Sequence, residues 1–168
     1  MISRMCSIFF GLLLLISTST YSLEVIEILG GKASEIPIAI APFEGSEIIS
    51  GQKAHQIISS DLNRTGLFRP LNTSGIFSPP SSDININYTK WSAMDAQFIV
   101  VGKVEIENPV SGNIKVTWSL IDIFKEKTVV SMRYTGKKSQ YRAIAHKVSD
   151  NVYEHLTGSK GIFHTKIA

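Results

Sequence analysis

The sequence predicts a two-layer α/β sandwich built from two long helices and about five strands. Three successive segments within residues 97–135 show the two-residue alternation of an antiparallel meander. Two other stretches, which start near Ser50 and Ser139, carry apolar residues at helical spacing. The 168 residues, 43% of them hydrophobic, suit one globular domain with a single core.

The first predicted elements are short. LEVIEIL at residues 23–29 has apolar side chains on both faces, as in a strand that is covered on both sides. IPIAIAPF at residues 36–43 is a second apolar run, and its two prolines confine the strand to little more than its centre. LFRPL at residues 67–71 is extended, and its proline suits a sheet edge. YTKWSAM at residues 88–94 has room for one or two helical turns, with Trp91 buried.

The last three predicted strands follow one another and are separated only by turns. QFIVVGKVEI at residues 97–106 holds the continuous β-branched and aromatic run of a buried strand. IKVTWSLIDIF at residues 114–124 and VVSMRYT at residues 129–135 alternate apolar with polar residues. The apolar side of this alternation consists of Ile114, Val116, Trp118 and Leu120, followed by Val130, Met132 and Tyr134.

Two long helices complete the predicted fold. The first runs for about four turns from the neighbourhood of Ser50, and Gly66 is placed to end it. The second runs from about Ser139 to Thr157, with Ser139 as its N-cap and Gly158 as its stop. Its apolar stripe is formed by Tyr141, Ile144, Ala145, Val148, Val152 and Leu156, and the residues expected in solvent are Lys147, Asp150 and Glu154.

Residues 1–22 have the parts of a secretory signal peptide. Arg4 lies in a basic start, IFFGLLLLI follows, and small polar residues lead to Ser22. The apolar run is too short to span a bilayer, so we expect cleavage after Ser22 and no membrane span afterwards; an uncleaved anchor is the alternative. Cys6, the only cysteine, precedes the apolar run and is therefore no lipid attachment site. The mature chain is expected to lack disulfides and cysteine-based zinc sites.

No set of residues in the sequence supports an enzyme. The nucleophile motif G-x-S-x-G is missing, and no phosphate loop has the required spacing. His146 and His155 are nine residues apart, which places them on opposite sides of one helix, so they cannot share a metal ion. Asp61 and Glu44 are expected to be solvated carboxylates rather than an acid and base pair. We therefore expect no catalytic site, no metal and no cofactor.

The charge pattern also disfavours nucleic-acid binding. The formal net charge is only +3, and the basic residues are scattered along the chain, whereas nucleic-acid surfaces need clustered basic residues. A partner-binding or scaffold module is the simplest remaining class. Residues 23–29 suit strand addition to a partner, although the pattern alone fits a plain core strand equally well.

Four segments in the right order resemble the amino-terminal domain of TolB, a periplasmic component of the Tol-Pal system. They are IPIAIAPF, DLNRTGLFRPL, WSAMDAQFIVVGKV and YRAIAHKVSDNVYEHLTGSKGIFHTKIA. The resemblance implies a five-stranded mixed sheet with two helices, similar in shape to an anticodon-binding domain. It also implies a non-enzymatic scaffold that acts in protein import, outer-membrane integrity and constriction during cell division.

The resemblance points to one partner-binding segment. In the family, the mature amino-terminal strand engages the inner-membrane protein TolA, which raises the partner-binding interpretation above that of a core strand. The matching residues are Leu23, Glu24, Val25, Ile26, Glu27, Ile28 and Leu29.

The expected organisation is a signal peptide at residues 1–22, a domain at residues 23–160, and the start of a β-propeller at residues 161–168. Family members continue into that propeller, which binds the lipoprotein Pal. We expect residues 161–168 to be a truncated entry and the propeller to be absent from this chain, so binding of Pal is in doubt. The alternative function is a nucleic-acid-binding module of the anticodon-binding type, suggested by the fold and by a pI of about 9.0. A secreted hydrolase would need a triad or metal site that the sequence does not reveal.

Overall fold

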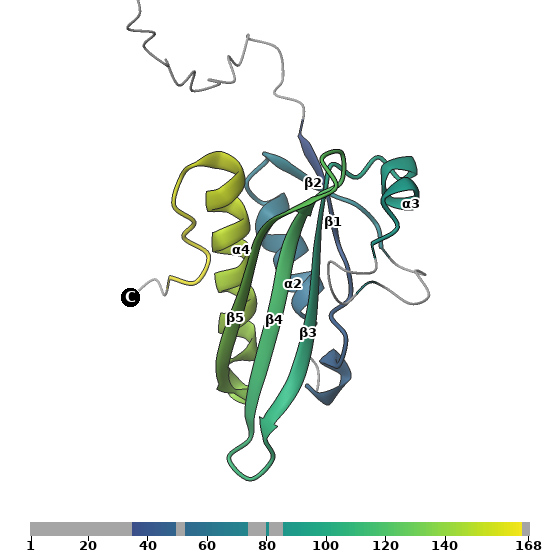
Figure 1. The fold of residues 1–168 in the computed structure, drawn as a ribbon. Helices are drawn as coiled ribbons and strands as arrows, with labels where there is room; N and C mark the ends of the chain where they lie inside the picture. The colour runs from purple at the N-terminus through teal and green to yellow at the C-terminus, as the bar shows by residue number, and fades with distance from the viewer. Residues whose placement is uncertain (1–34, 50–52, 74–79, 81–85, 166–168) are drawn as a thin grey trace, which may run out of the picture. The chain divides into compact units, whose positions relative to one another are not determined.

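The described residues form a mixed parallel and antiparallel β-sheet with helices on both faces. The computed structural model describes residues 35–49, 53–73, 80 and 86–165, all within the unit Ala33–Ala168 (Figure 1). The strands are β1 (Ile36–Ile40), β2 (Phe68–Pro70), β3 (Phe98–Asn108), β4 (Asn113–Asp122) and β5 (Lys127–Lys137). The helices are α2 (Ala54–Asn63), α3 (Tyr88–Ala93) and α4 (Tyr141–Thr157), with short 3-10 turns η2 (Ser46–Ile48) and η4 (Lys138–Gln140).

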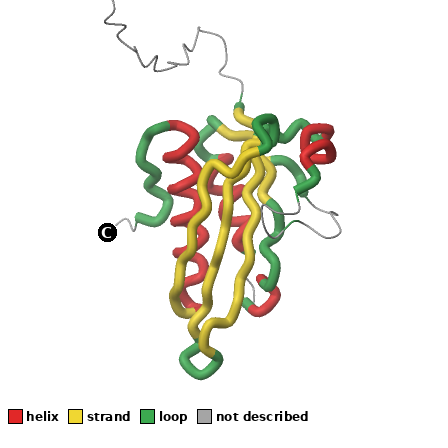
Figure 2. The backbone as a smooth tube through the Cα atoms, viewed as in Figure 1, coloured by secondary structure: helices red, strands yellow, loops and turns green. Residues whose placement is uncertain are grey.

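The five strands lie in the order β2-β1-β3-β4-β5 (Figure 2). β1 pairs in parallel with both β2 and β3, and β3, β4 and β5 form an antiparallel meander. The predicted fold class and the predicted meander are thereby confirmed. Because β1 is paired on both sides, the free edges among the described strands belong to β2 and β5.

Helices α2 and α4 pack together on one face of the sheet (Figure 1). Alternation along the strands supplies the sheet side of this core, as shown by Ile38 and Ile40 of β1 and Trp118 of β4, which are at most 1% exposed. The helices contribute the apolar stripe that their spacing predicts. None of the helices in the described ranges is long and apolar enough to cross a membrane.

The opposite face of the sheet is covered at one end by α3. Trp91 is 2% exposed, so its predicted burial is confirmed. It packs in a second apolar cluster with the strand residues that point to this face, such as Ala39, Ile99 and Ile121. The Asn87 side chain accepts a hydrogen bond from the Lys90 N–H (2.9 Å) and caps the helix. β1 and the first part of β3, residues 98–101, are therefore buried on both faces.

The helix ends differ from the predicted ones in detail. α2 is shorter than four turns, because the chain tightens after Asn63 into a turn in which Thr65 Oγ1 donates to the Leu62 carbonyl (2.7 Å). Ser139 is not the N-cap of α4, since it already belongs to the 3-10 turn η4, and Gln140 occupies the cap position. Gly158 does end α4, at a φ of 72° that favours glycine.

A buried carboxylate joins the two long helices. Asp61 of α2 is 0% exposed and lies 2.7 Å from His146 Nδ1 of α4. It also accepts a hydrogen bond from Ser149 Oγ (2.8 Å), and Arg64 pairs with its other oxygen. The expectation of a solvated Asp61 is wrong, because the residue faces α4, where its charge is matched by polar partners; Glu44, in contrast, is exposed.

A second buried carboxylate fastens the segment that follows α4. Asp150 is 7% exposed and accepts hydrogen bonds from the N–H groups of Phe163 (2.6 Å) and His164 (3.2 Å), while the His164 ring pairs with it. The prediction of a solvated Asp150 is therefore wrong. Residues 161–165 fold back onto α4, and a Cβ at Gly161 would lie only 2.5 Å from Asp150 Cα.

Asp61→Asn is expected to lower the free energy of unfolding by about 2–4 kcal/mol, because the amide keeps the shape but loses the charge that holds buried donors. Urea unfolding of the full chain measures this. The matched control is Glu154→Gln on the exposed part of α4, which should change the free energy by less than about 0.5 kcal/mol. Equal effects of the two substitutions would contradict the role of Asp61.

Asp150→Asn is expected to loosen the segment after α4 more than the rest of the domain. The amide hydrogens of Phe163 and His164 should exchange roughly tenfold faster or more, as their charged acceptor is lost. Hydrogen exchange followed by NMR measures this, again with Glu154→Gln as the control. Unchanged exchange at both amides would show that the carboxylate does not fasten the segment.

Candidate partner-binding surfaces

The predicted TolA-binding residues 23–29 lie outside the described residues, so the structure gives no position for any of them. It does describe the strand that comes next in the chain. β1 starts at Ile36 and is hydrogen-bonded to β2 on one side and β3 on the other. Within the described part of the chain, β1 therefore has no free edge.

The two free edges of the sheet differ in what they offer to a partner. β2 has only three residues and ends at Pro70, which has no N–H to donate. Its Arg69 pairs with Asp95, just after α3. β5 has eleven residues and is the longer edge, so it can accept a longer segment.

The side chains of β5 form two rows with different chemistry. Val130, Met132 and Tyr134 are half-buried and pack against the main core. The Tyr134 hydroxyl accepts a hydrogen bond from Asn151 Nδ2 of α4 (2.7 Å). Burial raises the pKa of Tyr134, and the bond from Asn151 opposes this rise. The other row, which faces away from α2 and α4, consists of the exposed residues Ser131, Arg133, Thr135 and Lys137.

Beside that exposed row, the open face of the sheet carries a small ion-pair network. Glu105 of β3 lies 2.8 Å from Lys115 Nζ and 3.1 Å from Lys103 Nζ. Hydrogen bonds from Lys115 and Lys103 lower the pKa of Glu105, and the bond to Glu105 raises the pKa of Lys103. Within the described part of the chain, no carboxylate forms an ion pair with Arg133 or Lys137, so this face is positively charged at its β5 edge.

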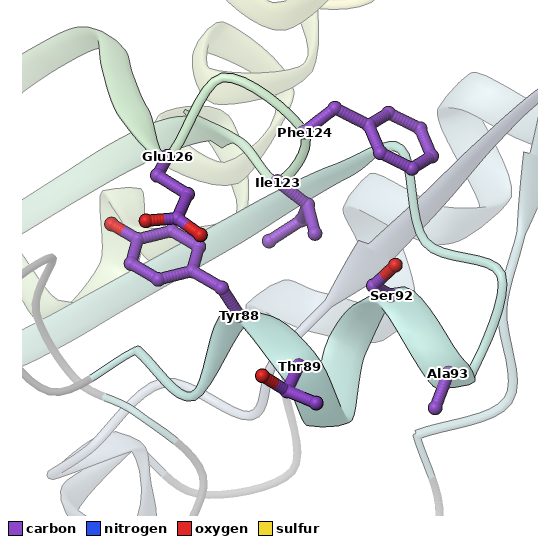
Figure 3. Close-up of a pocket in the computed structure, with 7 residues that line it drawn as sticks. All are labelled: Tyr88, Thr89, Ser92, Ala93, Ile123, Phe124 and Glu126. Carbon is purple, nitrogen blue, oxygen red and sulfur yellow. The ribbon is translucent and has the colours of Figure 1, made fainter.

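An open groove of about 510 Å³ lies between α3 and the turn that joins β4 to β5 (Figure 3). Tyr88 and Glu126 line one end and Phe124 and Ser92 line the other. Phe124 is 67% exposed, and Glu126 has a φ of 50°, in the left-handed region. The groove could hold an apolar side chain, but it contains no nucleophile and base pair.

The residue types of a catalytic triad do meet at Asp61, but in the wrong arrangement. Ser149 Oγ donates to Asp61 rather than to His146, so the histidine is not placed to take its proton as in a triad. Ser149 is also 0% exposed and out of reach of a substrate. Among the residues that the structure describes, no three His, Cys, Asp or Glu side chains are grouped to hold a metal ion.

The comparisons with known proteins agree on one family. The model of the TolB amino-terminal domain matches residues 24–129. "Tol-Pal system protein TolB" of Methylobacillus flagellatus is 39% identical over 98% of this chain, and that of Nitrosomonas europaea is 40% identical over 94%. The chain spans 39% and 36% of the lengths of these two relatives.

The fold comparison gives the same result. The crystal structure of TolB from Acinetobacter baumannii superposes with a TM-score of 0.62 and 27% sequence identity. The match covers 76% of this chain and 30% of that one. The fold of this domain therefore has a counterpart in a solved TolB structure. With the sequence match over more than half of its residues, the chain belongs to the TolB amino-terminal domain family.

Proposed function

We propose that this chain is a non-enzymatic, partner-binding component of the Tol-Pal system that works in the periplasm. Its membership of the TolB amino-terminal domain family supports the assignment to the Tol-Pal system. The signal-peptide pattern of residues 1–22 supports a periplasmic location. Ser149 is buried and donates to Asp61 rather than to a histidine, which supports a binding role rather than a hydrolytic one. We propose that the system's work in protein import, outer-membrane integrity and constriction at division is the process it serves.

One observation carries the proposal for the binding segment. Among the described residues, the five strands come from residues 36–137, and both edges of β1 are occupied. We propose that this sheet does not need residues 23–29 and that the segment adds as a strand to a partner. Its apolar side chains on both faces suit that mode of binding.

We propose TolA as the partner of residues 23–29, as the family resemblance implies. We place the domain at residues 23–160, after the signal peptide, and residues 161–168 as the path out of it. Asp150 fastens this path to α4 at Phe163 and His164. The proposal does not extend to Pal, which the resemblance assigns to a propeller outside these residues.

The nucleic-acid alternative receives no comparable support from the described surface. The open face combines Lys103, Lys115, Arg133 and Lys137 with the carboxylate of Glu105. No aromatic side chain lies among them to stack on a base. A positive face of this size suits an acidic protein surface better than a phosphate backbone, which needs many basic contacts.

Deletion of residues 23–29 is expected to weaken binding to the carboxy-terminal domain of TolA roughly tenfold or more, because the segment supplies the strand that adds to the partner. A pull-down and a titration with purified proteins measure this. Ile26→Pro should weaken binding in the same way, because proline removes a backbone donor.

Ile26→Val is the matched control and should bind like the unchanged chain, because it keeps the backbone and an apolar side chain. Circular dichroism of each variant shows that the domain is folded. Equal binding by the deleted and the unchanged chain would refute the role of residues 23–29.

A further inference from the structure

The outer edge of β5 presents unpaired backbone groups to a second strand. The N–H of Lys138 points toward β4 and donates to the Gly112 carbonyl (3.1 Å). The N–H of Lys137 points away from β4 and donates to the side-chain oxygen of Gln140 in η4 (2.9 Å). Successive N–H groups of a strand point to opposite edges. The N–H groups of Arg133 and Thr135 therefore share the direction of Lys137 and face outward, where no other strand of the described part pairs with β5.

The two faces of β5 carry different side chains, and a strand added beside β5 would extend both faces of the sheet. On the open face, the exposed row contains two cations, Arg133 and Lys137, and β5 has no acidic residue. On the helix face, Met132 and Tyr134 are half-buried beside the main core. A neighbouring strand lies only about 5 Å away, so its alternate side chains would meet cations on one face and apolar groups on the other.

We propose that β5 accepts, by strand addition, an extended acidic segment of another protein. The segment carries carboxylates on one face, at positions opposite Arg133 and Lys137, and apolar side chains on the other face. Because these two cations are four residues apart in one row, the carboxylates of the partner are also four residues apart. Backbone hydrogen bonds along β5 supply affinity, and the charges fix the register.

Two other occupants fit this edge less well. A second copy of the chain, paired β5 to β5, would bring Arg133 and Lys137 close to the same cations of its partner, and like charges on adjacent strands repel. The segment at residues 23–29 has its carboxylates, Glu24 and Glu27, three residues apart, so an extended chain places them on opposite faces. An acidic segment of another protein satisfies both rows.

The test uses the full chain and two labelled peptides of about nine residues with the same composition. The first has glutamate at its third and seventh positions, threonine at the fifth and valine or isoleucine at the even positions. In the second, one glutamate moves from the seventh to the sixth position, which puts the two on opposite faces. Fluorescence anisotropy should show roughly tenfold or more tighter binding of the first peptide.

Charge reversal in the protein tests the residues. Arg133→Glu and Lys137→Glu should each weaken binding of the first peptide roughly tenfold or more, because repulsion replaces attraction. Lys90→Glu on α3, an exposed cation away from β5, is the control and should leave binding within about twofold. Deletion of residues 23–29 should also leave it unchanged, so this inference and the proposed TolA contact fail independently.

Hydrogen exchange distinguishes strand addition from binding of the peptide by charge attraction alone. With the first peptide bound, the amides of Arg133 and Thr135 should exchange roughly tenfold slower or more, because they become bonded to the added strand. Equal binding of the two peptides, or unchanged exchange at these amides, would overturn the proposal in favour of simple charge attraction. Absence of binding by either peptide would also overturn it and would leave the cations as a guard against unwanted strand pairing.

Discussion

The double pairing of β1 is the constraint on which the rest of the structure depends. β1 lies between β2 and β3 and sends Ile38 and Ile40 to one face and Ala39 to the other. The large residues support the two long helices, while the small ones leave room for Trp91 of α3. Because β1 is paired on both sides, only β2 and β5 keep a free edge among the described strands.

Most of the fold could be predicted from periodicity, because periodicity records which side of an element is buried. The alternation of β4 and β5, the burial of Trp91 and the stop at Gly158 follow from local patterns. Asp61 and Asp150 could not be predicted, because their burial depends on groups elsewhere. Asp61 contacts His146, which lies 85 residues further along the chain. Helical periodicity shows which face of a helix a carboxylate lies on, but not which residue of another helix packs against it.

For the candidate sites, the sequence and the structure supply different parts. Residues 23–29 were identified by their apolar side chains on both faces and by the family resemblance, and they precede the described strands. The β5 edge needed the structure, because its value depends on its terminal place in the sheet and on Arg133 and Lys137 standing without carboxylate partners in the described part. The two surfaces would let one small domain bind two extended partners, one through its own strand and one at its sheet edge.

The central proposal is that the five described strands, β1 to β5, form a stable sheet without help from residues 23–29. Hydrogen exchange on the chain with these residues deleted tests it most directly, through the amides of Ile38 and Ile40 at the centre of the sheet. The account predicts unchanged protection at both amides and a free energy of unfolding within about 1 kcal/mol of the undeleted chain. Loss of protection along β1, or a larger loss of stability, would show that the segment is part of the core and would contradict the account.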